Sequence, residues 1–179
     1  MSRQITGLRY AHRYPAKWPP AIPRPRPRGI KALGARYESA FAKSLPAAER
    51  GVWWEFIDDN GPGLCQTDFI WINGPDIIIF ECKHTWTDEG MAQLAGLYIP
   101  VVSRALQRNV TGIQICKHLV PWAGPTAISL EEALANARAT GQPTTLHWRG
   151  LVPIAPSAKR SPDWRDATNC SCANIFSMA

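Results

Sequence analysis

The stretch CQTDFIWINGPDIIIFECKHTW, residues 65–86, decides the fold of this 179-residue chain. Two runs of β-branched and aromatic residues, which favour strands, flank a turn formed by residues 73–76. We predict antiparallel strands over about residues 64–72 and 77–84. Both faces of this hairpin carry apolar side chains, so the sheet must be covered on both sides.

Charged residues interrupt this apolar hairpin near its open end. Opposed positions of an antiparallel hairpin have a constant sum, and the turn sets it at 149, so Asp68 is predicted to face Glu81. Alternation of side chains places Lys83 on the same face as Glu81. Three charges are therefore predicted to gather at one end of a buried sheet.

Opposed carboxylates in a buried sheet repel each other and lose hydration. A divalent cation offsets both costs, and Mg²⁺ suits one or two carboxylates with backbone carbonyl, water and phosphate oxygens. Beside it, Lys83 is predicted to orient or deprotonate a water that attacks phosphorus. The alternative is an ion pair between Lys83 and one acid, Asp68 or Glu81, with no chemistry.

The other segments complete an α/β pattern. They predict, in chain order, a helix over residues 31–45, a strand over 52–58, a loop over 58–63, a helix capped by Thr87 and bent or broken near Pro100, a strand over 112–120, a short helix between Ser129 and Gly141, and a strand within 144–150. We therefore predict a central mixed sheet with a three-stranded antiparallel meander flanked by helices.

The N-terminal 29 residues form a distinct, basic segment. They hold six of the 16 prolines, and residues 1–37 hold nine of the 20 lysines and arginines and no acid. We predict an extended arm over residues 1–29, a core over 30–150 and an irregular tail over 151–179 packed on the core. An arm of this charge favours a nucleic-acid partner, although a solvated arm or one packed on its own domain is the alternative. The predicted DNA contacts are Arg24, Arg26, Arg28, Lys31 and Arg36.

Composition favours a soluble protein of the cytoplasm, without a membrane segment or a signal peptide. The absence of a GxxxxGK[ST] loop predicts no nucleotide cofactor. We expect reduced thiols, with Cys65, Cys82 and Cys116 buried as small apolar residues. Cys170 and Cys172 leave a metal or iron–sulfur site as an alternative.

The spacing of Asp68 before Glu81-Cys82-Lys83 resembles the core motif of the PD-(D/E)xK nuclease superfamily. Members of that family include restriction enzymes, RecB-type exonucleases and Holliday junction resolvases. The resemblance covers residues 31–120 and implies a helix, a three-stranded antiparallel meander, a helix and a further strand. It implies Mg²⁺, or Mn²⁺, held by Asp68, Glu81 and the backbone carbonyl of Cys82, with Lys83 as a catalytic residue.

The same resemblance suggests three more site positions. Glu38 fits the acid on the first helix as a further metal ligand, unless it is a solvated helix residue. Gln93 fits a catalytic Gln after the ExK strand, and Tyr98 follows it at a spacing of five instead of the usual four. The literal Pro75-Asp76 pair lies in the turn, so we assign the metal-binding role to Asp68.

We therefore expect a Mg²⁺-dependent deoxyribonuclease, structure-selective in the manner of a Holliday junction resolvase and acting as a homodimer on branched or duplex DNA. Its setting would be recombination or bacteriophage genome processing, in the host cytoplasm if phage-encoded. One alternative is a RecB-like exonuclease. Another is a catalytically silent DNA-binding or virion-assembly protein on the same fold, and a third is an α/β domain whose arm binds an acidic protein.

Overall fold

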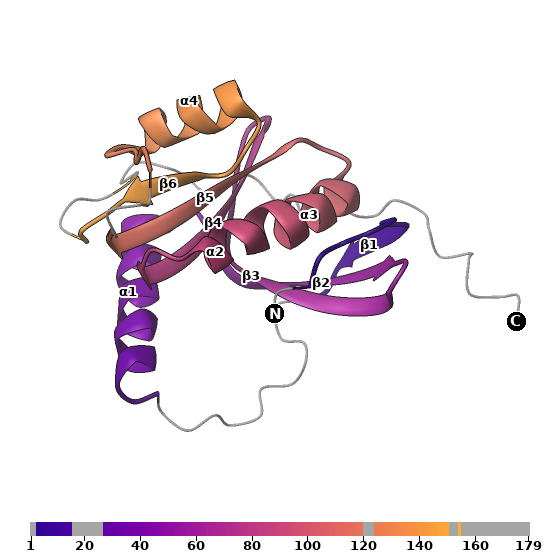
Figure 1. Ribbon diagram of the computed structural model, residues 1–179, viewed down its shortest axis with the longest axis horizontal. Helices are drawn as coiled ribbons and strands as arrows, with labels where there is room; N and C mark the ends of the chain where they lie inside the picture. Colours follow the sequence, from indigo (N-terminus) through magenta and orange to yellow (C-terminus); the bar gives the residue numbers. More distant parts are fainter. Residues whose placement is uncertain (1–2, 16–26, 120–123, 151–153, 155–179) are drawn as a thin grey trace, which may run out of the picture.

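The computed structural model describes residues 3–15, 27–119, 124–150 and 154. These residues form an α/β fold built on a six-stranded mixed sheet in the order β1-β2-β3-β4-β5-β6 (Figure 1). Its elements are β1 (Tyr10–Arg13), α1 (Ile30–Ser44), β2 (Glu49–Asp58), β3 (Gly61–Asn73), β4 (Asp76–Thr85), α2 (Asp88–Gln93), the π-helical turn η1 (Leu94–Tyr98), α3 (Ile99–Leu106), β5 (Val110–His118), α4 (Leu130–Thr140) and β6 (Thr144–His147). Strands β1 to β4 are antiparallel, whereas β5 and β6 run parallel to β4.

The β3–β4 hairpin has the predicted register. Ile70 lies opposite Ile79, which gives the constant sum of 149. The paired residues extend from the turn to Phe69 and Phe80, so the ladder ends one position before the two predicted carboxylates. Beyond that point β3 remains paired with β2, and β4 remains paired with β5.

Helices cover both faces of the sheet, as the two-sided apolar pattern predicts (Figure 1). One core lies under α1 and α4 and includes Phe41, Phe69, Phe80, Ile113 and Ala133. The other lies under η1 and α3 and includes Ile70, Ile79, Leu94, Val101 and Val102. Alternation along β4 therefore gives each face its own packed layer, and Glu81 and Lys83 belong to the face under α2 and η1.

The turn between β2 and β3 is tighter than the predicted loop over residues 58–63. Only Asp59 and Asn60 separate the two strands, and Gly61 begins β3 with a φ of 93°, which glycine adopts without strain. The buried Asp58 carboxylate accepts a hydrogen bond from the Asn60 backbone amide and forms an ion pair with Arg3. These contacts let residues 61–63 remain strand despite their glycine and proline content.

The second helical segment runs from residue 88 to residue 106 as α2, η1 and α3, without the break that is the alternative to a bend near Pro100. Thr87 caps it as predicted, since its side chain accepts a hydrogen bond from the Gly90 amide. Pro100 has no amide hydrogen to donate to the Gly96 carbonyl. That carbonyl instead accepts a hydrogen bond from the Ile5 amide at 3.2 Å. Gly96 lies within the π-helical turn η1, so the helix is irregular at this point.

Part of the predicted arm belongs to the sheet. Residues 10–13 form the edge strand β1, antiparallel to β2, and Arg13 forms an ion pair with Glu49. The Arg3–Asp58 pair adds a second charged tie between this segment and β2. The Pro- and Arg-rich residues 16–26, including Arg24 and Arg26, lie outside the described residues, as does nearly all of the predicted tail over 151–179.

Further features agree with the sequence. Ser129 caps α4 and Gly141 ends it in the left-handed conformation. Cys65, Cys82 and Cys116 are buried free thiols, whereas Cys170 and Cys172 lie outside the described residues. In the part of the chain that the structure describes, no helix is both long and apolar enough to cross a membrane.

Candidate active site

Asp68 and Glu81 lie just beyond the last pair of the β3–β4 ladder. The Cys82 backbone amide donates a hydrogen bond to Asp68 Oδ2 at 2.8 Å, so a side chain takes over where the ladder ends. On the neighbouring strand β2, the register places Gly51 opposite Asp68, and Gly51 adopts a φ of 67°. The carboxylate of Asp68 is thus tied to the residue that follows Glu81.

Lys83 connects Glu81 to the helix that covers this face. Its Nζ lies 2.6 Å from Glu81 Oε1 and donates to Gln93 Oε1 at 3.3 Å. Gln93 is the last residue of α2, so β3, β4 and α2 each contribute to one cluster. The structure therefore brings together Asp68, Glu81, Lys83 and Gln93, four of the five predicted catalytic residues.

The fifth residue, Glu38, is engaged by an arginine. It lies on α1 and forms an ion pair with Arg50 of β2 at 2.9 Å. Its charge still reaches the cluster, because it contributes to raising the pKa of both Asp68 and Glu81. Glu38 lies at the margin of the cluster. To bind a cation there, its carboxylate would have to give up the ion pair with Arg50.

The two central carboxylates are poorly solvated. Burial is the largest cause that raises the pKa of Asp68 to about 6, against the opposing hydrogen bond from Cys82. Burial and then the charge of Asp68 raise the pKa of Glu81 to about 7, although Lys83 lowers it. Burial lowers the pKa of Lys83, but the carboxylates of Glu81 and Asp68 outweigh it and leave the pKa above its ordinary value.

A divalent cation fits this donor set. Glu81 is 3% exposed, and its buried Oε2 has no hydrogen-bond partner among the residues described. A bound cation would satisfy that oxygen and lower both raised pKa values. Within residues 3–15, 27–119, 124–150 and 154, the fold brings no three His, Cys, Asp or Glu side chains close enough together to hold a metal between them. Mg²⁺ needs only one or two carboxylates with water and carbonyl oxygens, such as that of Cys82.

The five-residue spacing from Gln93 to Tyr98 has a structural explanation. The intervening turn is π-helical, with a hydrogen bond from the Ile99 amide to the Leu94 carbonyl. Hydrogen bonds in a π turn join residues five apart, so Tyr98 lies roughly one turn after Gln93. Tyr98 is buried in the core under η1 and α3, and burial, followed by Glu81 and Asp68, raises the pKa of its phenol.

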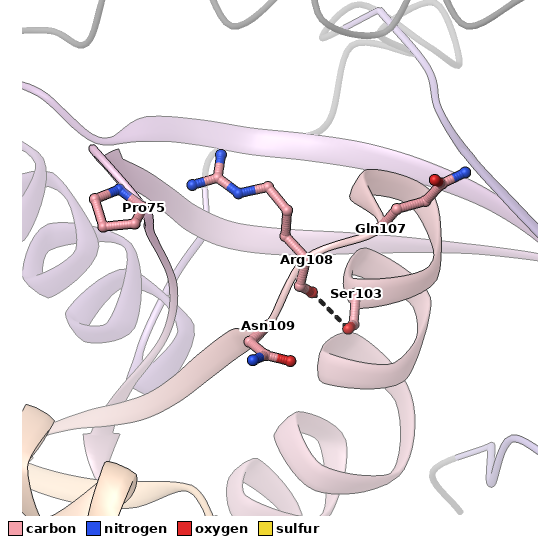
Figure 2. Close-up of a pocket in the computed structure, with 5 residues that line it drawn as sticks. All are labelled: Pro75, Ser103, Gln107, Arg108 and Asn109. Carbon is pink, nitrogen blue, oxygen red and sulfur yellow. Dashed lines mark hydrogen bonds between the residues drawn. The ribbon is translucent and has the colours of Figure 1, made fainter.

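Asp76 lies away from this cluster, at the turn end of the hairpin. It pairs with Asn73 across the turn and forms an ion pair with Arg138 of α4 at 2.9 Å. Beside this turn is a shallow polar hollow (Figure 2). Its lining residues are Pro75, Ser103, Gln107, Arg108 and Asn109. Glu81 lies five strand residues farther along β4, about 16 Å away.

The predicted DNA contacts are only partly placed. Arg28, Lys31 and Arg36 are exposed at and near the start of α1. Arg50 and Gln114 are polar residues beside the cluster that the sequence pattern did not identify. Arg50 lies opposite Phe69, a register that depends on the two-residue turn between β2 and β3 and so could not be predicted locally. Gln114 is a single amide inside an apolar strand, which gives no pattern to identify it.

Comparisons with known proteins give no family. The sequence matches no protein-family model and no curated protein. Among solved structures, the chain is similar to the crystal structure of protein VC1899 from Vibrio cholerae, with a TM-score of 0.35 and 12% identity. The match covers 66% of this chain, and the chain spans 29% of that protein.

Proposed function

We propose that this protein is a Mg²⁺-dependent deoxyribonuclease that hydrolyses phosphodiester bonds. The observation that supports the proposal best is the convergence of Asp68, Glu81, Lys83 and Gln93 at one end of the sheet, with Glu81 Oε2 buried and unpartnered among the described residues. A purely structural ion pair between Lys83 and Glu81 would leave that oxygen without a partner.

Asp68, Glu81 and the Cys82 carbonyl would hold the cation. When bound, Mg²⁺ supplies positive charge that stabilises the charge developing on the phosphate and on the leaving oxygen. The hydrogen bond from the Cys82 amide fixes the Asp68 carboxylate before any ligand arrives. Such prior orientation of the ligands is what a preorganised site requires.

Lys83 acts in this proposal as a hydrogen-bond donor. Because the carboxylates around it raise its pKa, its ammonium group remains protonated near neutral pH in the cation-free protein. A protonated lysine orients a water molecule or contacts a phosphate oxygen, so of the two predicted roles, orientation is favoured over removal of a proton. Gln93 Oε1 holds the ammonium group from the helix side.

The DNA backbone would approach from the side where arginine and lysine side chains are exposed. Arg50 is half-exposed at the margin of the cluster, and Arg28, Lys31 and Arg36 are exposed on and before α1. Lys and Arg side chains neutralise phosphates without reading the sequence. We propose that the enzyme selects DNA by its structure, as a junction-resolving homodimer with paired incisions.

The test is cleavage of labelled substrates under single-turnover conditions. The panel contains a four-way junction, a flap, a linear duplex, a single strand and a circular plasmid, each with Mg²⁺ and with EDTA. The site-dead control is Asp68→Asn, which keeps the shape of the side chain. We expect Mg²⁺-dependent cuts placed symmetrically in the junction, and none with the variant.

The other functions predict different results on the same panel. An exonuclease degrades the linear duplex from its ends and leaves the circular plasmid intact. A silent DNA-binding protein binds the substrates in a salt-dependent way without cutting any of them. Cutting that persists in EDTA or in Asp68→Asn would contradict the proposed site.

A further inference from the structure

Gln114 of β5 is a buried amide beside the candidate active site. It is 0% exposed and is paired in parallel register with Glu81 of β4, so both side chains lie on the same face of the sheet. A Cβ atom added to Gly90 of α2 would lie 2.1 Å from Gln114 Nε2 and 3.3 Å from Lys83 Cε. Gln114 and Lys83 therefore lie side by side beneath the start of α2.

The amide group of Gln114 has a defined orientation. Its Nε2 donates to the Thr87 carbonyl oxygen at 2.9 Å, and because that carbonyl can only accept, the nitrogen must face α2. The other end of the amide, Oε1, is buried and has no hydrogen-bond partner within the described part of the chain. Buried polar atoms are nearly always satisfied, so an unpartnered acceptor here requires an explanation.

Two buried oxygens of neighbouring residues share this condition. When Glu81 is ionised, as at pH 8, Glu81 Oε2 and Gln114 Oε1 are both acceptors, so neither can satisfy the other. A cation, or a water molecule on a cation, can satisfy both at once. Amide oxygens are ordinary ligands of hard divalent cations, and Mg²⁺ keeps several of its waters, which need acceptors of their own.

We propose that the side-chain oxygen of Gln114 binds the divalent cation of this site, or a water molecule on that cation. This inference rests on the proposed function and adds a residue from a third strand of the sheet to the site. Gln114 would fix the position of the cation relative to Glu81. Gly90 supports this arrangement, because any larger residue there would displace the amide.

A plain structural role for Gln114 gives a different expectation. The bond to Thr87 alone would make the residue a link between β5 and the start of α2. Its loss would then lower the stability of the cation-free protein and leave Mg²⁺ affinity unchanged. The two roles are therefore separated by measuring cation binding, without DNA and without activity.

The experiment is calorimetric titration of Mg²⁺ at pH 8, together with the rise in melting temperature that Mg²⁺ produces. Gln114→Met keeps the length of the side chain and removes both the oxygen and the donor to Thr87, whereas Gln114→Glu loses the donor and keeps an oxygen. Thr145→Val is the matched control, because Thr145 pairs with Gln114 across β5 and β6 and is buried, but its hydroxyl already accepts from Trp86 Nε1.

We expect Gln114→Met to weaken Mg²⁺ binding by about tenfold or more, because losing a residue that supports a metal site typically lowers its affinity by that much. Gln114→Glu should bind within about threefold of the wild type or more tightly, and Thr145→Val should bind as the wild type does. Wild-type affinity in Gln114→Met, or loss of affinity in Thr145→Val equal to that in Gln114→Met, would overturn the inference.

Asp68→Asn separates this inference from the proposed function. If the wild type binds Mg²⁺, Asp68→Asn does not and Gln114→Met binds normally, the site stands and only the role of Gln114 is refuted. If the wild type binds no Mg²⁺ at all, the cation site and the role of Gln114 are refuted together.

Discussion

Glu81→Gln should stabilise the cation-free protein at pH 8, although it removes an ion pair with Lys83. In the folded chain the pKa of Glu81 rises from 4.5 to about 7, chiefly because the carboxylate is buried. At about 1.4 kcal/mol per pKa unit, ionising Glu81 costs the fold about 3 kcal/mol. Gln keeps the shape of the neutral acid and avoids this cost, so the melting temperature should rise by about 6–12 °C.

The pH dependence gives the sign of the effect. Because its pKa is raised by folding, Glu81 destabilises the fold progressively as pH increases from about 4.5 to about 7, and fully above that range. The stability difference between Glu81→Gln and the wild type should therefore be largest at pH 8 and nearly absent at pH 4. In millimolar Mg²⁺ the difference should shrink, because only the wild type keeps both carboxylate ligands and is stabilised by the bound cation.

The assay is thermal and urea unfolding in EDTA and in Mg²⁺ at both pH values. Glu131→Gln is the control, since Glu131 is exposed in the first turn of α4, and its loss should cost less than about 1 kcal/mol. A Glu81→Gln variant that is less stable than the wild type at pH 8 in EDTA would refute the reasoning. That result would show that the Lys83–Glu81 pair is a net stabilising contact.

Four other predictions concern the same site and its substrate. Lys83→Ala should keep Mg²⁺ and DNA binding but lose about 100-fold or more in the single-turnover cleavage rate, and undiminished cleavage would remove Lys83 from the mechanism. Mg²⁺ binding, followed by calorimetry, should strengthen as pH increases from 5 to 8, because the cation displaces protons from Asp68 and Glu81, whose pKa values are raised to about 6 and 7; a flat profile would contradict this. Gly90→Ala should weaken Mg²⁺ binding, because the new methyl group overlaps the amide of Gln114; unchanged affinity would show that the amide can move. Changing three arginines to glutamine should reduce the salt dependence of DNA binding by about 0.9 in slope for each phosphate that is no longer neutralised, whereas an unchanged slope would show that the arm does not touch phosphate. The three arginines are Arg24, Arg26 and Arg28.

The sequence predicted the hairpin well because its signal is local. The turn at residues 73–76 fixes the register of β3 and β4, and the register fixes which side chains share a face. The apolar pattern on both faces required helices on both sides, and these are present. The positions of Asp68, Glu81 and Lys83 follow from this register alone.

Features that depend on distant contacts could not be predicted in the same way. Strand β1 forms because residues 10–13 find a partner in β2, about 40 residues later, and local composition there indicated only an extended chain. The carbonyl of Gly96, which Pro100 leaves without an amide donor, accepts a hydrogen bond from Ile5, about 90 residues earlier in the chain. The ion pair of Arg50 with Glu38 depends on how α1 packs against the sheet, which no local pattern gives.

Asp68 and Glu81 are proposed to hold a cation that the protein uses to hydrolyse DNA. The most direct measurement is the single-turnover cleavage of a labelled four-way junction by the wild type and by Asp68→Asn, in Mg²⁺ and in EDTA. We predict cleavage only for the wild type in Mg²⁺. Cleavage by Asp68→Asn, or wild-type cleavage in EDTA, would contradict the proposal, and so would junction binding by the wild type without any cleavage in Mg²⁺.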